Sequence, residues 1–172
     1  MGKEYDIIFN KKEEVDTHVA IRDILHEGDE TLRKISKPVA QVDGYIQRLL
    51  DDMLETMRQA DGCGLAAPQI GVLRRVVVVE VEGEVFELIN PEIISTQGEV
   101  TDAEGCLSVP GRAGLVTRPQ TVTVRATGRD GQVHEYTGQG LLARAFCHEL
   151  DHLDGILYID KMIEELEMED ED

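Results

Sequence analysis

The chain has 172 residues, of which 41% are hydrophobic and 30% charged, a size and composition that suit one domain with a sizeable core. Its formal net charge of −18 argues against direct binding to nucleic acid, because a polyanion repels phosphate backbones. No apolar run approaches the roughly 18 residues of a membrane span, and the N-terminus lacks the apolar run of a signal peptide, so we predict a cytoplasmic protein. The three cysteines include no CxxC pair, which predicts reduced thiols rather than disulfides.

Residues 1–19 are polar and weakly patterned, and we predict an N-terminal arm there, followed by a single domain over residues 20–163. Between Gly44 and Ala60 the apolar residues recur at helical spacing, and Asp43 precedes them as a capping residue. This stretch therefore predicts an amphipathic helix. The glycines of the DGCG sequence that follows are expected to end it.

Two later stretches predict β-hairpins. In RRVVVVEVEGEVFELIN, residues 74–90, valine-rich segments flank a Glu-Gly turn at residues 82–83. In TVTVRATGRDGQVHEYTG, residues 121–138, valines alternate with polar residues before a turn-forming Asp-Gly pair. The two stretches place antiparallel strands in the middle and second half of the chain.

Helical spacing returns from about Gln139 and predicts a second helix. The order of helix, strands, more strands and helix lacks the alternation that builds parallel sheets. We therefore predict an α+β fold with short antiparallel β-sheets packed around a central C-terminal helix. The final segment, residues 164–172, is almost entirely acidic, which is typical of a solvated tail.

The second helix contains CHELDHLDG, residues 147–155, with an HExxH motif formed by His148, Glu149 and His152. Histidines four positions apart lie on one face of a helix, so both can bind one metal while the glutamate lies beside it. This motif alone is typical of zinc proteases. However, no histidine follows it and only the acidic tail remains, so a third ligand is expected upstream.

Two upstream stretches carry candidate residues. In DAEGCLSVPG, residues 102–111, the Cys106 thiolate is a suitable third ligand for zinc or ferrous iron, and one cysteine with two histidines leaves a position open for water. In GCGLAAPQIG, residues 62–71, a glycine-rich segment can approach a substrate closely, and Gln69 can donate to a developing oxyanion. A buried structural thiol and a simple connection are the alternatives for these two stretches.

In this order, the motifs GxGLAAPQ, EGCLS and HExDH resemble the three motifs of the bacterial peptide deformylases. The resemblance extends from about Ala20 to Met162. It implies that Cys106, His148 and His152 bind one Fe2+ ion per chain, for which Zn2+, Ni2+ or Co2+ can substitute. It also implies a metal-dependent hydrolase that removes the formyl group from the N-terminal formylmethionine of nascent polypeptides and releases formate.

The same resemblance implies roles for the other motif residues. Glu149 corresponds to the catalytic glutamate, and Gln69 and the backbone N–H of Leu107 correspond to the groups that stabilise the oxyanion. Metal-bound water or hydroxide would attack the formyl carbon while Glu149 acts first as general base and then as general acid. The negative charge of the thiolate ligand suits ferrous iron and predicts a site that is sensitive to oxygen.

An extended peptide is expected to bind beside the glycine-rich segment, like an added β-strand. The methionine side chain would enter an apolar pocket. The candidate substrate-binding residues are Cys63, Gly64, Gly105, Leu141 and Ala145.

Two other functions compete with the deformylase. A zincin-type endopeptidase is supported by HExxH alone and leaves GCGLAAPQ and EGCLS unexplained. A binding protein without catalysis would not need Glu149 or Gln69.

The expected partner is a formylmethionyl peptide, with transient proximity to the ribosome. We expect no clear docking extension, because ribosomal RNA would repel the acidic tail. For Arg118 and Arg144, buried ion pairing is expected rather than catalysis.

Overall fold

The computed structural model of the chain describes residues 19–169. The predicted arm therefore lies outside the described residues, apart from its last position. Within them, no helix combines the length and the apolar character needed to cross a bilayer.

The helical elements are η1 (Glu30–Arg33), α2 (Gly44–Gln59), η2 (Ala67–Ile70), α3 (Leu141–Leu153) and η3 (Tyr158–Asp160). The strands are β1 (Gly64–Ala66), β2 (Val76–Val81), β3 (Glu84–Gln97), β4 (Val100–Cys106), β5 (Val109–Arg118), β6 (Thr121–Thr127), β7 (Val133–Gln139) and β8 (Glu164–Leu166).

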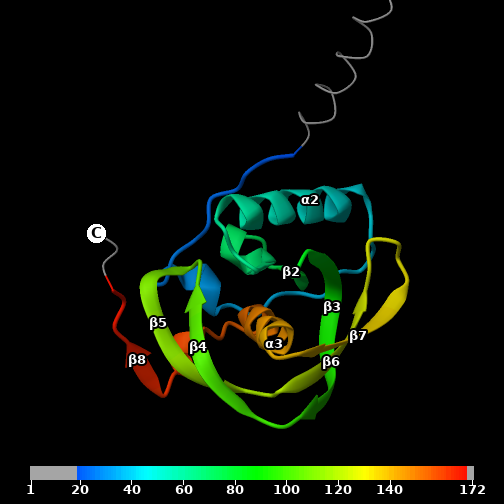
Figure 1. The fold of residues 1–172 in the computed structure, drawn as a ribbon. Coiled ribbons are helices and arrows are strands. Elements are labelled where there is room, and N and C mark those ends of the chain that lie inside the picture. Colours follow the sequence, from blue (N-terminus) through cyan, green and yellow to red (C-terminus); the bar gives the residue numbers. More distant parts are fainter. Residues whose placement is uncertain (1–18, 170–172) are drawn as a thin grey trace, which may run out of the picture.

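Two antiparallel sheets lie on either side of helix α3 (Figure 1). The larger sheet has the strand order β1-β2-β3-β6-β7, and the smaller has the order β4-β5-β8. Helix α3 contacts strands of both sheets, whereas α2 packs on the β1–β2 end of the larger sheet. The predicted α+β architecture around a C-terminal helix is confirmed.

Helix α2 forms where the sequence predicts it. The side chain of Asp43 caps its first turn by accepting a hydrogen bond from the Ile46 N–H at 3.1 Å. One face of the helix is buried and packs in a cluster with Val76 and Val78 of β2. That burial fixes the segment following α2, which leads into β1 and the candidate site.

Both predicted hairpins are present as β2–β3 and β6–β7. In the first, Glu82 and Gly83 have positive φ angles of 53° and 77°, as a tight two-residue hairpin turn requires. Strand β3 continues to Gln97, seven residues beyond the predicted end of its hairpin at Asn90, and pairs there with β6. The long strand β3 is therefore the central strand of the larger sheet and joins the two hairpins.

Helix α3 is buried on most of its surface because it lies between the sheets. Phe146 packs edge-to-face against Phe86 of β3, with ring centroids 5.3 Å apart. The same helix carries buried polar residues, which need partners in the surrounding strands. The buried polar residues of α3 are Arg144, His148, Glu149 and His152.

Several strands and short helical turns were not predicted from the sequence. Strands β4 and β5 form a hairpin that carries the EGCLS motif at its tip. The GCGLAAPQ segment forms β1 and η2 rather than an irregular connection. Strand β8 lies at the start of the acidic segment and pairs with β5 through its backbone, so its acidic side chains do not prevent strand formation.

Candidate active site

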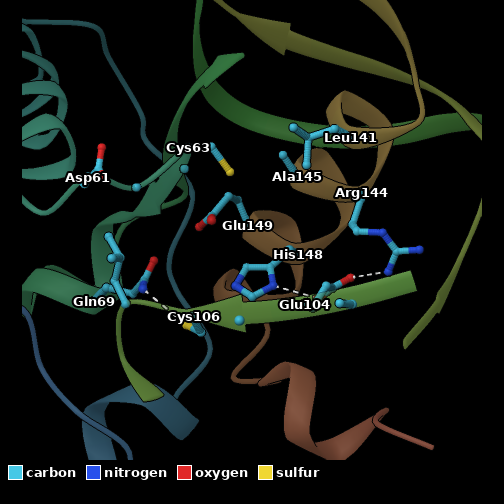
Figure 2. Close-up of a pocket in the computed structure, with 15 residues that line it drawn as sticks. Asp61, Cys63, Gln69, Glu104, Cys106, Leu141, Arg144, Ala145, His148 and Glu149 are labelled. Carbon is cyan, nitrogen blue, oxygen red and sulfur yellow. Dashed lines mark hydrogen bonds and ion pairs between the residues drawn. The ribbon is translucent and has the colours of Figure 1, made fainter. Parts of the chain in front are cut away.

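A cavity of about 360 Å³ opens where β1, the tip of the β4–β5 hairpin and helix α3 meet (Figure 2). Every residue that the sequence predicts for the site lines this cavity, with the single exception of His152. Residues from all three motifs, which lie far apart in the sequence, therefore meet around one cavity. His152 lies behind them, buried on α3 one turn after His148.

Cys106, His148 and His152 form a compact cluster of metal-ligand atoms. One ligand atom from each residue lies within 4.8 Å of the other two. The Cys106 Sγ and His152 Nε2 atoms are 3.4 Å apart. Burial lowers the pKa of His152 well below its usual range, which keeps the imidazole neutral, the form that binds metals. This donor set fits one divalent transition-metal ion with an open coordination position.

Glu104 orients one of these candidate ligands, His148. Its Oε2 atom lies 2.9 Å from His148 Nδ1, so the other ring nitrogen of His148 is left for a metal. The carboxylate also accepts hydrogen bonds from Arg118 at 2.7 and 3.0 Å and from Arg144 at 2.8 Å. Burial would raise its pKa, but hydrogen bonds from His148 and Arg118 outweigh that effect and lower the pKa of Glu104 to about 2.

The expected ion pairing of Arg118 and Arg144 is confirmed. Arg118 bridges Glu104 to Asp151, whose Oδ2 atom accepts a hydrogen bond at 2.7 Å. Lys161 approaches the same oxygen at 2.9 Å. A chain of alternating charges therefore runs from His148 through the β4–β5 hairpin and back to helix α3. Glu104 is the member of this chain that touches a predicted metal ligand.

Glu149 lies at the centre of the cavity, beneath β1 (Figure 2). Burial raises the pKa of its carboxyl group to about 7. Among the described residues, its Oε2 atom has no hydrogen-bond partner. A Cβ atom on Gly64 would lie 2.5 Å from Glu149 Oε1, so the carboxyl group fits only because that position is glycine. A carboxyl group with a pKa near neutrality can both accept and return a proton.

The Gln69 amide is held with its nitrogen toward the metal-ligand cluster. Its Oε1 atom accepts a hydrogen bond from the Ala66 N–H at 2.9 Å, and its Nε2 atom donates to Ser108 Oγ at 3.0 Å. The same nitrogen lies 3.7 Å from Cys106 Sγ. Leu107 and Ser108 form the turn that follows Cys106. Both predicted oxyanion groups therefore lie beside the thiol.

The predicted substrate-binding residues lie around the cavity mouth. Cys63, Leu141 and Ala145 lie on the opposite side of Glu149 from Cys106 (Figure 2). Strand β4, which contains Gly105, is at the edge of its sheet. Such an edge presents unpaired backbone groups to an extended peptide.

Sequence reasoning missed Glu104 and Arg144 as residues of the cavity wall. A signal was present, because Arg144 precedes His148 by four positions and therefore shares its helix face. Glu104 lies inside the EGCLS motif itself. Neither position reveals, without the fold, that the two side chains meet at 2.8 Å.

Comparison with known proteins identifies similar sequences and structures. The family model described as polypeptide deformylase matches residues 21–167. Peptide deformylase of Acetivibrio thermocellus is 57% identical over 145 residues, 84% of this chain and 85% of the relative. That of Lachnoclostridium phytofermentans is 58% identical over 147 residues, 84% of this chain and 90% of the relative. The crystal structure of a peptide deformylase from Legionella pneumophila superimposes with a TM-score of 0.81 at 50% identity, covering 83% of this chain and 86% of that one.

Proposed function

Because the chain belongs to the polypeptide deformylase family, we propose that Cys106, His148 and His152 hold one ferrous ion at its catalytic centre. The chain is a metal-dependent hydrolase that removes the N-formyl group from the formylmethionine at the start of nascent polypeptides. The observation that carries the assignment of residues is the cluster of three ligand atoms within 4.8 Å, in a site that also contains Glu149, whose Oε2 atom has no hydrogen-bond partner among the described residues.

The roles of the residues follow from their positions. A divalent ion bound by this cluster would act as a Lewis acid and lower the pKa of a water molecule toward neutrality. Glu149, whose pKa is raised to about 7, would accept a proton from the attacking water and return it to the leaving amine. The Gln69 amide and the Leu107 N–H donate to the formyl oxygen as negative charge develops there.

The peptide binds along the free edge of β4. In this arrangement Gly105 and Cys63 offer backbone groups to an extended chain, and Gly64 keeps the approach to Glu149 open. The methionine side chain lies against Leu141 and Ala145. The cavity volume of about 360 Å³ is of the size that small-molecule sites have in proteins.

The cellular setting is also a proposal. A substrate that exists on nascent chains places the reaction in the cytoplasm, close to translating ribosomes. The net charge of −18 opposes tight contact with ribosomal RNA, so we propose transient encounter rather than stable docking.

The test uses protein purified without oxygen and loaded with ferrous iron. We expect formate release from formyl-Met-Ala-Ser, and a decrease of about 10²–10⁴-fold in the Glu149→Ala variant, because the proton acceptor is lost. Iron content, measured by atomic absorption, should be unchanged in this variant, since Glu149 is not a ligand. The Glu84→Ala variant is the matched control, because Glu84 is an exposed glutamate of β3, outside the cavity.

A companion pair of variants tests the ligand set. Cys106→Ala should lose iron, whereas Cys147→Ala should retain it, because Cys147 packs in the hydrophobic core next to Phe146. Exposure of the ferrous form to air should inactivate it faster than the zinc form. Cleavage of internal peptide bonds without formate release, or retention of iron by Cys106→Ala, would contradict the proposal.

A further inference from the structure

A second cavity, of about 110 Å³, adjoins the one that contains the candidate metal ligands. Three residues line both cavities: Ala103 of β4 and Leu141 and Arg144 of α3. These three side chains therefore form the partition between the two spaces. The second cavity extends from this partition toward Gln120 and Gly140, the residue that precedes α3.

Arg144 is the fixed part of this partition. Its guanidinium group donates to Glu104 Oε1, to the Val116 carbonyl and to the Val100 carbonyl, each at 2.8 Å. These contacts hold the head group between β4 and β5 and leave the side chain 9% exposed. Leu141, by contrast, is 59% exposed. Figure 2 shows the Arg144 side chain extending from α3 toward Glu104, on the far side of the cavity from Gln69.

We propose that Arg144 determines the length of side chain that the enzyme accepts at the first residue of its substrate. This inference rests on the proposed function, in which that side chain enters the pocket beside Leu141 and Ala145. The aliphatic part of Arg144 closes the far end of the pocket and separates it from the second cavity. A methionine side chain fills the space up to this wall, and a longer unbranched side chain meets it.

The physical basis is that binding weakens sharply when a substrate side chain is too long for its pocket. Close-packed protein interiors tolerate an added methylene poorly when the wall cannot move. Three hydrogen bonds to two strands and a buried carboxylate make this wall difficult to displace. If the wall is removed, each additional methylene that enters the second cavity gains at most about fourfold in binding, the factor for burial of one CH2 group.

The experiment compares formyl-peptides of the form formyl-Xaa-Ala-Ser on the iron-loaded enzyme. Xaa is methionine, 2-aminohexanoic acid of equal length, or 2-aminooctanoic acid, which is two methylenes longer. For the wild-type chain we expect the longest substrate to have a kcat/KM about tenfold or more below that of the hexanoic analogue. For Arg144→Ala we expect the ratio of the two values to rise by about tenfold, because the two cavities merge.

Arg118→Lys is the matched control. Arg118 also binds Glu104, at 2.7 and 3.0 Å, but it lines neither cavity. This variant should lower kcat/KM for all three peptides by a similar factor and leave their ratio unchanged. Arg144→Met, which keeps an unbranched stem at the partition but loses the three hydrogen bonds that fix it, should raise the ratio less than Arg144→Ala does.

Two further outcomes are decisive. If Arg144→Ala does not fold, Leu141→Ala opens the same partition from its exposed side and should shift the ratio in the same direction. An unchanged ratio in the folded Arg144→Ala variant, or in Leu141→Ala where that replaces it, would overturn the inference. Failure of the wild-type chain to release formate from formyl-Met-Ala-Ser would instead overturn the proposed function.

Discussion

Glu104 is the residue that holds the imidazole of His148, one of the three candidate metal ligands, in its orientation. It is 6% exposed, and a buried carboxylate is stable only when its oxygens are fully hydrogen-bonded. Arg118, Arg144 and His148 supply those bonds. The sequence places Glu104 in a motif but does not distinguish it from the other acidic residues, because its partners lie 14, 40 and 44 positions away.

The role of Glu104 can be tested with Glu104→Gln. An amide of the same shape cannot accept from two arginines and His148 together, so His148 should lose its fixed orientation. We expect the affinity for Zn2+ or Co2+ to fall by about 10–100-fold, the usual effect of removing a partner of a metal-binding histidine. Competition with a chromogenic chelator measures this affinity without reference to catalysis.

Glu165→Gln provides the comparison, because Glu165 also pairs with an arginine, Arg112, but on the surface. Exposed pairs of this kind contribute little, so metal affinity should be unaffected. Equal affinities for Glu104→Gln and the wild-type chain would show that His148 is oriented by other contacts.

At the scale of elements, the site depends on how closely β1 approaches α3. Gly64 of β1 lies directly over Glu149 of α3, and no side chain fits between them. Gly62 is under a similar constraint, since a Cβ atom there would lie 2.6 Å from Leu107 Cδ1. The glycines of GCGLAAPQ therefore have a packing role in addition to any contact with substrate.

Gly64→Ala tests this packing. The added methyl group would lie 2.5 Å from Glu149 Oε1, so the strand or the carboxyl group must move. We expect the free energy of unfolding to fall by about 1–3 kcal/mol, as is typical of overpacking. A displacement of Glu149 by about 1 Å should lower kcat on the order of 100-fold. Urea unfolding and formate release measure the two effects separately.

Gly44→Ala is the control, because the new Cβ atom there would meet only the flexible end of Arg48, at 3.4 Å. Gly44 begins helix α2, where alanine should be neutral or slightly stabilising. If Gly64→Ala retains wild-type activity, the close approach of β1 does not position Glu149.

The elements that the sequence predicts are those with a periodic pattern of apolar residues. Helix α2 buries one face, and strand β2 buries both faces over Val76–Val79. Their apolar residues therefore form a pattern that can be recognised in the sequence. Strand β4 carries VTDAEGC and is largely exposed, so it has no such pattern. Its position is fixed by backbone pairing with β5 and by Arg144, both of which depend on the tertiary fold.

At the scale of the whole molecule, the candidate metal centre joins two structural units. Cys106 lies at the tip of the β4–β5 hairpin in the smaller sheet, whereas His148 and His152 lie on α3, which also packs against the larger sheet. An ion bound by all three would cross-link these units. The order of motifs in the sequence indicates the candidate ligands, but only the fold shows that they come from two structural units.

Removal of the metal should therefore lower the stability of the chain as well as its activity. Binding to the folded state alone stabilises it by about 4 kcal/mol when free metal is present at a thousand times its dissociation constant. For a chain of 172 residues this corresponds to a decrease in Tm of roughly 8–16 °C on removal, at about 2–4 °C per kcal/mol. Differential scanning calorimetry of the zinc form, with and without a chelator, measures this difference.

Cys106→Ala separates the cross-link from general effects of the chelator. Without the thiol, the two histidines on α3 should bind metal weakly at most, and an ion held by them alone would not join the helix to the hairpin, so the chelator should change the Tm much less. Cys147→Ala retains all three ligand atoms and should keep the full metal-dependent difference, although its own Tm will be lower because Cys147 is buried. A wild-type Tm that does not respond to metal removal would mean that the hairpin and α3 are held together by their protein contacts alone, chiefly those of Glu104 with Arg144 and His148.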